Sequence, residues 1–238
     1  DLGRQRKRGV QDHGSGVLAF GRSNRGRHGN QIERSCDFRR FRFTRVQPPT
    51  LPGMETTRLI AIRHGETAWN VDTRIQGQLD IGLNDRGLWQ ARQAARALAD
   101  EPIAAIYSSD LSRAFETARA IGAVAGLEPV PHIGLRERAF GVFEGLTWAE
   151  IETAWPEDTR RWRDREPGWA PTQGETLEQV RDRVAAATDA LAQRHPGEQI
   201  VLVAHGGVMD ALYRLATQQH LQGPGAWGLE VLLRCQSV

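Results

Sequence analysis

The stretch Arg63-His64-Gly65-Glu66-Thr67 is the part of the sequence that most clearly indicates the fold of this chain. It follows a short apolar run, Leu59-Ile60-Ala61-Ile62, and precedes a polar loop. Open α/β sheets bind ligands at the carboxyl ends of their strands, which is where this stretch would lie. Arg63 offers a planar fork of donors for an oxyanion, and His64 offers a nucleophilic nitrogen or a proton acceptor. Gly65 lets the backbone approach both side chains closely.

A second stretch repeats this design, because the apolar run Val201-Leu202-Val203-Ala204 is followed by His205-Gly206-Gly207. A single Arg-His-Gly tripeptide is weak evidence for a site, since such tripeptides also occur in ordinary exposed turns. Two apolar strands that each end in His-Gly form a more specific pattern. The pair predicts one site to which both strand ends contribute.

The composition is typical of a globular protein, with 39% hydrophobic and 25% charged residues in a chain of 238. No run of about 18 apolar residues is present, so we expect no transmembrane helix and no membrane partner. The two cysteines, Cys36 and Cys235, lie near the two ends and cannot build a disulfide framework or a metal cluster between them. We therefore expect a cytoplasmic protein.

The net charge of +2 is the sum of a basic N-terminal segment and an acidic remainder. Residues 1–53 hold 12 Arg and Lys against 4 Asp and Glu, a net of +8, whereas residues 54–238 hold 19 against 25, a net of −6. The mildly acidic larger part argues against a polyanion such as DNA as the main ligand, so nucleic acid is not the expected partner.

Residues 1–53 are expected to be a disordered or non-native Arg-rich extension, because their scattered apolar residues cannot bury enough surface to offset the ordering entropy. The segment could be a basic tail that touches nucleic acid or membrane, an Arg-rich transit peptide, or sequence outside the natural protein. We favour the last reading, because the first methionine, Met54, lies four residues before the first predicted strand.

From Met54 on, hydrophobic periodicity predicts strands that alternate with helices. The predicted strands are 58–62, 104–107, 128–133 and 201–204, with one further candidate at 229–233. The predicted helices are 85–99 after an Asn84 N-cap, 111–125 before Gly126, 147–154, 157–164, 175–194 and 207–217. This alternation indicates an α/β fold: a three-layer α/β/α sandwich around a mostly parallel central sheet.

Three segments complete the predicted organisation. Residues 54–221 form one domain, and residues 222–238 form an atypical C-terminal tail. A small helical cap is expected at about 140–172, where four tryptophans should pack against one another: Trp148, Trp155, Trp162 and Trp169.

The residue types limit which reactions the two His-Gly strand ends could catalyse. Two histidines are too few to hold a metal alone, even if Glu66 and Asp210 were recruited, so no metal site is expected. A serine hydrolase of the G-x-S-x-G kind is excluded by the absence of that motif, and a P-loop is absent as well. Oxyanion chemistry on a phosphate remains, with Arg63 and Arg113 as further donors and a histidine as the natural nucleophile.

Residues 58–217 closely resemble the histidine phosphatase superfamily, the phosphoglycerate mutase-like proteins. The matching pieces occur in the order of the family and are spread over about two thirds of the chain. They are Arg63-His64-Gly65-Glu66-Thr67, Asn70, Gln76-Gly77, Ser108-Ser109-Asp110-Leu111-Ser112-Arg113-Ala114, Thr117-Ala118, Leu135-Arg136-Glu137, Phe140-Gly141, Glu144-Gly145, Gly174-Glu175-Thr176 and Ala204-His205-Gly206-Gly207.

The resemblance implies a role for each matching position. His64 would attack phosphorus and form a phosphohistidine, and Glu137 would protonate the leaving oxygen and then take a proton from water. The substrate would be bound by Arg63, Asn70, Gln76, Gly77, Arg113, Glu137, His205 and Gly206, with Arg63, Arg113 and His205 also counted as catalytic. A structural alternative for Glu137 is a salt bridge with Arg136 or Arg138.

The two histidines would need different protonation states. His64 must present an unprotonated nitrogen, whereas His205 would hold a dianion better when charged. The pKa values of the two imidazoles are therefore expected to shift in opposite directions, with turnover highest at mildly acidic to neutral pH.

Within the family, the sequence is similar to the phosphatase branch. Mutases of the family resemble one another in using a lysine and an arginine pair to grip a charged intermediate, and no lysine follows Lys7 here. The resemblance thus implies a metal-independent phosphomonoester hydrolase without a cofactor, acting on a small phosphorylated metabolite. Phosphoglycerate mutase activity is the alternative, and a homodimer is possible.

Two departures from the family support a further alternative, a catalytically impaired member with a basic nucleic-acid-binding tail at its N-terminus. The loop Asp80-Ile81-Gly82-Leu83-Asn84 stands where the family usually has Pro-Leu-Thr. The end of the chain, Glu230-Val231-Leu232-Leu233-Arg234-Cys235, lacks the Asn of the usual last strand. A missing strand there would weaken the sheet.

Overall fold

The computed structural model describes residues 56–222 and 231–234. The predictions for residues 1–53, for a start at Met54 and for most of the tail 222–238 lie outside the described residues. Among the described helices, none combines the length and the apolar character needed to cross a membrane.

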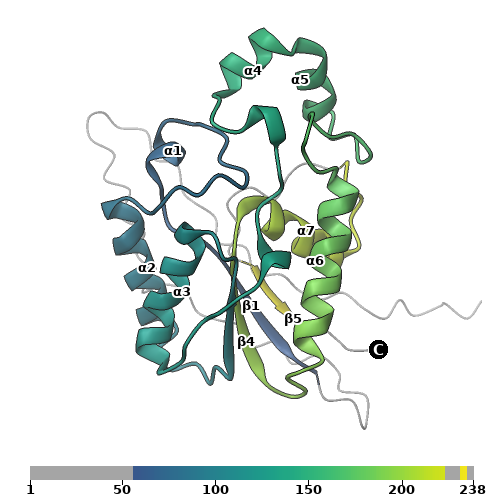
Figure 1. The fold of residues 1–238 in the computed structure, drawn as a ribbon. Coiled ribbons are helices and arrows are strands. Elements are labelled where there is room, and N and C mark those ends of the chain that lie inside the picture. Colours follow the sequence, from purple (N-terminus) through teal and green to yellow (C-terminus); the bar gives the residue numbers. More distant parts are fainter. Residues whose placement is uncertain (1–55, 223–230, 235–238) are drawn as a thin grey trace, which may run out of the picture. The chain divides into compact units, whose positions relative to one another are not determined.

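The described part of the chain contains a five-stranded sheet in the order β3-β2-β4-β1-β5 (Figure 1). Neighbouring strands pair in parallel from β3 to β1, and β5 is antiparallel to β1. The strands are β1 (Arg58–Arg63), β2 (Ala105–Ser108), β3 (Val130–Pro131), β4 (Gln199–Ala204) and β5 (Val231–Arg234). The predicted mostly parallel sheet is confirmed.

Helices cover both faces of this sheet, which confirms the three-layer α/β/α sandwich (Figure 1). One face carries α2 (Asp85–Ala97) and α3 (Ser112–Ala125), and the other carries α6 (Leu177–Ala192) and α7 (Gly206–Thr217). Every residue of the central strand β4 is buried. Because side chains alternate along a strand, Val201 and Val203 join the core under α2 and α3, while Ile200 and Leu202 join the core under α6 and α7.

Helix ends follow the expected local chemistry. The Asn84 side chain accepts a hydrogen bond from Gly87 N at the start of α2, and Gly126 ends α3 in the left-handed region with φ of 70°. Helix α6 begins after a capping box of Thr176 and Gln179, two residues later than predicted. Apart from β3, the predicted boundaries differ from the structure by one or two residues.

The predicted strand 128–133 is wrong in its length. Only Val130–Pro131 pairs with β2, and a 3₁₀ turn, η2 (Ile133–Leu135), follows directly. Pro129 and Pro131 lack the N–H groups that a longer ladder would need, so the strand stays short and lies at the edge of the sheet.

The polar loop expected after Arg63-His64-Gly65-Glu66-Thr67 contains a short helix that the periodicity did not reveal, α1 (Ala68–Val71). Thr67 and Asn70 form its capping box, with Asn in place of the usual Glu or Gln. A four-residue helix has no apolar stripe, which explains why the sequence pattern missed it.

The cap region has a small core of its own. It comprises η3 (Gly141–Phe143), α4 (Trp148–Ala154) and α5 (Pro156–Arg163), and Figure 1 shows α4 and α5 above one end of the sheet. Phe143, Ile151 and Trp169 are buried there, and the rings of Trp148 and Trp162 lie 4.9 Å apart between centroids. The four tryptophans thus serve packing in this region.

The last strand is present despite its unusual sequence. Strand β5 pairs with β1 from Arg58 opposite Arg234 to Ala61 opposite Val231. The edge of the sheet beside β1 is therefore covered, and the loss of a sheet strand that motivated the impaired-member alternative is not observed.

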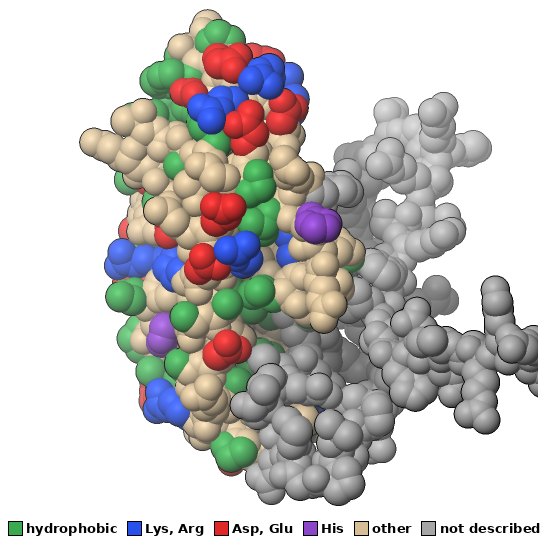
Figure 2. Space-filling view, turned by 90° about the vertical axis from the view of Figure 1, so that its right-hand side faces the viewer, with side chains coloured by type: hydrophobic (Ala, Val, Ile, Leu, Met, Phe, Trp, Pro, Cys, Tyr) green, Lys and Arg blue, Asp and Glu red, His purple; other side chains and the backbone are tan. Residues whose placement is uncertain are grey.

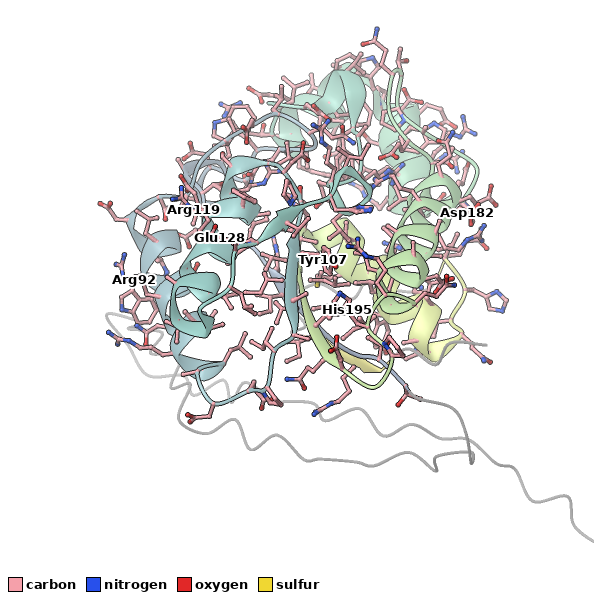
Figure 3. The ribbon with its side chains drawn as sticks, turned by 60° about the horizontal axis from the view of Figure 1, so that its bottom comes forward. Arg92, Tyr107, Arg119, Glu128, Asp182 and His195 are labelled. Carbon is pink, nitrogen blue, oxygen red and sulfur yellow. The ribbon has the colours of Figure 1, made fainter. Side chains whose placement is uncertain are left out.

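A polar chain at the amino-terminal end of the sheet ties β2 to the turn after α6 (Figure 3). His195 Nδ1 lies 2.7 Å from a carboxylate oxygen of Glu198, which can only accept, so Nδ1 carries the proton. His195 Nε2 then accepts from the Tyr107 hydroxyl at 2.8 Å. Tyr107 is 2% exposed, so this hydroxyl depends on His195 for its hydrogen bond.

Replacing Tyr107 with Phe should lower the free energy of unfolding by about 1 kcal/mol, because it removes this bond and leaves His195 Nε2 without its donor. Urea denaturation measures the loss. The matched control is Tyr213→Phe, since the one described partner of the Tyr213 hydroxyl is the exposed Gln219 side chain at 3.2 Å, and this substitution should change stability by less than about 0.5 kcal/mol. Equal effects of the two substitutions would contradict the structural role of the Tyr107–His195 pair.

Candidate active site

The two predicted histidines come together because β1 and β4 are neighbouring parallel strands. Arg63 pairs with Ala204 in the ladder, so the next residues, His64 and His205, leave the sheet side by side. Their ring centroids lie 5.1 Å apart. Both rings are buried, with His64 9% exposed and His205 fully covered.

The hydrogen bond of His64 selects its tautomer. Its Nδ1 lies 2.6 Å from the carbonyl oxygen of Gly65. A carbonyl oxygen can only accept, so Nδ1 carries the proton and Nε2 keeps its lone pair. The Gly65 backbone is itself held close to α2, since a Cβ at position 65 would meet the Gly87 oxygen at 2.5 Å. The tight turn after β1 thus aims an unprotonated nitrogen into the site.

Both imidazoles are pushed toward the neutral form. Burial, followed by the positive charges of Arg113 and Arg63, lowers the pKa of His64 from 6.5 to about 3. Burial likewise lowers the pKa of His205 well below 6.5, with His64, Arg113 and Arg63 as further causes. The prediction of opposite shifts is wrong for this state, because both rings are buried and face the same two guanidinium groups.

Arg113 is a fully buried cation in the first turn of α3. Its two terminal nitrogens donate to the carbonyl oxygens of Gly77 at 2.7 Å and Leu79 at 2.8 Å. Burial lowers the pKa of Arg113, but a guanidinium starts from a value so high that it stays charged. Carbonyl groups orient this charge without neutralising it, which leaves it available to an anion.

The unusual loop residue Asp80 supports the same helix. Its carboxylate accepts from Ser112 N at 2.7 Å and from the Ser112 hydroxyl at 2.8 Å, at the start of α3. A carboxylate at a helix N-terminus satisfies an otherwise unpaired N–H group. The departure from the family pattern at Asp80 is therefore compatible with a correctly placed Arg113.

Several buried polar atoms of the site have no hydrogen-bond partner among the described residues. They are Nδ1 and Nε2 of His205, Nε of Arg113 and Oε1 of Gln76. Leaving a buried polar atom unpaired costs about 1–3 kcal/mol, so native proteins rarely do so without a reason. Arg63 is exposed, and no described residue holds its guanidinium. An oxyanion bound here would supply acceptors for the donors among these groups.

Glu137 approaches the same place from the loop between η2 and η3. Its carboxylate oxygens accept from Gly207 N at 3.0 and 3.1 Å, and Oε1 also accepts from Arg138 N at 2.8 Å. A Cβ at position 207 would lie 2.4 Å from Oε1, so only glycine allows this approach. The carboxylate therefore lies at the start of α7, two residues after His205.

The salt-bridge alternative for Glu137 is contradicted. Arg136 pairs with Asp110, with N···O distances of 2.5 and 2.7 Å. Arg138 directs its side chain to the carbonyl oxygens of Glu175 and Trp169. Neither arginine side chain uses the Glu137 carboxylate, which leaves that group for the site.

The remaining predicted site residues differ in which of their polar atoms already have hydrogen-bond partners. Asn70 Oδ1 accepts from the Thr67 N–H and hydroxyl, so the amide nitrogen is the part of Asn70 that could reach a ligand. Gly77 contributes its carbonyl oxygen to Arg113, and Gly206 is the first residue of α7.

Two residues that shape the site had no recognisable sequence signal. Gln78 donates from Nε2 to the Glu137 carbonyl oxygen at 3.1 Å, and Arg183 donates to the backbone of the same loop. Both act through backbone atoms that are distant in sequence, and such contacts leave no periodicity or motif behind.

Apart from this site, a ligand could bind at a metal-ligand cluster or in a separate hollow. Within residues 56–222, no three His, Cys, Asp or Glu side chains are grouped as metal ligands. A hollow of about 430 Å³ lies near the carboxyl end of α7, among residues that include Arg181, Arg214 and His220. It borders Gln222, next to residues that the structure does not describe, and none of the predicted site residues lines it.

Comparisons with known proteins agree with this geometry. The model of the histidine phosphatase superfamily, branch 1, matches residues 59–233. Phosphoglycerate mutase-like protein 4 of Arabidopsis thaliana is 43% identical over 161 residues, covering 66% of this chain and 70% of the relative. The metal-independent phosphoserine phosphatase of the same plant is 39% identical over 173 residues, covering 71% and 72%.

Solved structures extend the likeness to the fold. A mycobacterial glucosyl-3-phosphoglycerate phosphatase, solved as a complex with VO3, superimposes with a TM-score of 0.65 at 37% identity, over 69% of this chain and 84% of that one. The match of the family model spans well over half of the chain and includes both His-Gly strand ends. The chain belongs to the histidine phosphatase superfamily.

Proposed function

We propose that this phosphomonoesterase hydrolyses a small phosphorylated metabolite in two displacements, through a phosphohistidine at His64 and without a metal. The observation that carries the proposal is the hydrogen bond from His64 Nδ1 to Gly65 O, because it leaves the Nε2 lone pair free on a ring that feels the positive charge of the buried Arg113. A neutral imidazole nitrogen is a competent nucleophile toward phosphorus.

In the first step, His64 Nε2 forms a bond to phosphorus while the bond from phosphorus to the leaving oxygen breaks. The leaving oxygen takes a proton from the carboxylic acid of Glu137. Arg113, Arg63 and an N–H of His205 hold the other phosphoryl oxygens and balance their charge as the transition state forms. Asn70, Gln76, Gly77 and Gly206 complete the pocket in this proposal.

In the second step, water attacks phosphorus and the bond to His64 Nε2 breaks, which returns the lone pair to the imidazole. Glu137, now a carboxylate, takes a proton from that water and is ready for another cycle. The hydrogen bonds from Gly207 N and Arg138 N hold the carboxylate in place for this transfer.

The charges of the cap favour hydrolysis over mutase activity. A mutase must retain a highly charged intermediate, which calls for free cations. In the described cap each arginine has a carboxylate partner: Arg160 with Glu157 and Asp164, Arg161 with Glu166, Arg163 with Glu152, and Arg165 with Asp210. Figure 2 shows positive and negative side chains interspersed over this region.

The names of the relatives support a general class of substrate. Two relatives carry phosphoserine and glucosyl-3-phosphoglycerate in their names, which supports a small phosphorylated metabolite here. A cytoplasmic location and a possible homodimer stay predictions from the sequence.

The phosphohistidine can be trapped directly. Rapid mixing with a ³²P-labelled phosphomonoester in the presence of EDTA, followed by an alkaline quench, should leave label on the protein at His64 that is lost in acid. His64→Ala should abolish the label and lower kcat by a factor on the order of 10³–10⁶. His220→Ala, at an exposed position, is the control and should keep both.

Turnover is also measured, without added metal, on a panel of phosphomonoesters: glycerol 3-phosphate, phosphoserine and 2- and 3-phosphoglycerate. The products of mutase activity are assayed in the same reactions. Turnover that requires added metal, or that persists in His64→Ala, would falsify the mechanism.

The neutral state of His64 also predicts a pH dependence of stability. Its pKa is about 3 in the folded protein and 6.5 when exposed, so the unfolded state binds more protons between these values and stability falls as the pH is lowered through this window. Between pH 7 and 5 the loss from one such histidine is about 2 kcal/mol.

Urea denaturation at pH 7 and pH 5 measures this loss. His64→Asn should lose about 2 kcal/mol less than the wild type between the two pH values, whereas His220→Asn should follow the wild type. If His64→Asn showed the wild-type slope, the imidazole of His64 would titrate normally in the folded protein and the description of its environment would be wrong.

A further inference from the structure

The guanidinium of Arg183, on α6, is bound to the loop that carries Glu137. Its NH1 donates to the carbonyl oxygens of Gly134 at 3.0 Å and Arg136 at 2.9 Å. Its NH2 lies 3.4 Å from the carbonyl oxygen of Glu137. One side chain thus reaches three carbonyl groups within four consecutive residues.

The same guanidinium is oriented by a carboxylate from the residues just before α6. Arg183 Nε and NH2 pair with the two oxygens of Glu175, at 2.9 and 2.8 Å. The pair is mostly buried, with side chains 23% and 21% exposed. Such a two-point pairing fixes the plane of the guanidinium, which an ammonium group could not do.

Glu175 holds the other side of the same loop. Its Oε2 accepts from Ala139 N at 2.9 Å, and its backbone N–H donates to Ala139 O at 2.8 Å. Arg183 and Glu175 therefore grip residues 134–139 from both ends, with Glu137 between the two points of attachment. The loop has no helix or strand of its own at Glu137, so its backbone path depends on these contacts and on the hydrogen bond from Gln78 Nε2 to the Glu137 carbonyl oxygen.

We propose that Arg183, oriented by Glu175, is a positioning residue that fixes the backbone of Glu137 so that its carboxylate meets both Gly207 N and the leaving oxygen of the substrate. Arg183 does not touch the reacting atoms. The inference rests on the proposed role of Glu137 as the proton donor. A displacement of about 1 Å in a catalytic group can lower a rate by about 10²-fold, so a backbone clamp of this kind has a measurable effect.

The dependence on the leaving group separates this role from general structural damage. Phenolate is a strong base and needs protonation as it leaves, whereas 4-nitrophenolate needs it far less. The ratio kcat/KM reports the steps up to departure of the leaving group and is not affected by hydrolysis of the phosphohistidine. Phenyl phosphate and 4-nitrophenyl phosphate are therefore a matched pair of probes.

Arg183→Met should lower kcat/KM for phenyl phosphate by about 10- to 100-fold and for 4-nitrophenyl phosphate by less than about threefold. Arg181→Met is the matched control on the same helix, since the ion-pair partner of Arg181 among the described residues is the exposed Asp182, and it should change neither value. Equal losses for the two probes, or no loss for either, would overturn the proposal.

Two further variants keep the test decisive. Arg183→Lys keeps the positive charge without the fork and should show the same probe-dependent loss, so it replaces Arg183→Met if that variant does not fold. Glu137→Gln should show a larger loss with the same dependence, and adding Arg183→Met to it should not increase the difference between the probes. If Glu137→Gln lowered both probes equally, the proposed role of Glu137 would fail, which is an outcome distinct from failure of Arg183→Met alone.

Discussion

A buried guanidinium beside two buried imidazoles is the constraint on which the rest of this structure depends. Removing the charge of Arg113 from water is costly unless hydrogen bonds compensate, and the carbonyl oxygens of Gly77 and Leu79 provide that compensation. Since carbonyl groups carry no net charge, the positive charge persists inside the protein. Burial is the main cause of the lowered pKa of His64 and of His205, and this charge lowers both values further. It also leaves a positively charged centre suited to a dianionic phosphoryl group.

The fold delivers these groups through backbone geometry. Parallel pairing of β1 with β4 places the two histidines side by side, and the first turn of α3 supplies Arg113. The loop of Glu137 has no regular structure, so it depends on contacts from α6 and from the start of α7. A small set of long-range hydrogen bonds thus completes a site whose other parts are fixed by regular structure.

The sequence predicted the sheet and the histidines because apolar runs with His-Gly at their ends carry local information. The short helix α1 was not foreseen, since a four-residue helix has no apolar stripe, and the strand around Pro129 and Pro131 was predicted too long. The direction of the His205 shift was wrong because full burial of a side chain cannot be read from its neighbours in sequence. Arg183 was missed for a similar reason, since its contacts with the Glu137 loop are to backbone atoms 46 to 49 residues away in sequence.

The central claim, two successive displacements at phosphorus through His64, is tested most directly by stereochemistry. Each in-line displacement inverts the configuration at phosphorus, so two displacements restore it, whereas direct attack by the acceptor inverts it once. A phosphomonoester made chiral at phosphorus with oxygen isotopes can be converted by the enzyme with an alcohol as acceptor, and the configuration of the product can be read by ³¹P NMR. The structure predicts retention of configuration. Inversion would show that no covalent phosphohistidine lies on the pathway and would contradict the role assigned to His64.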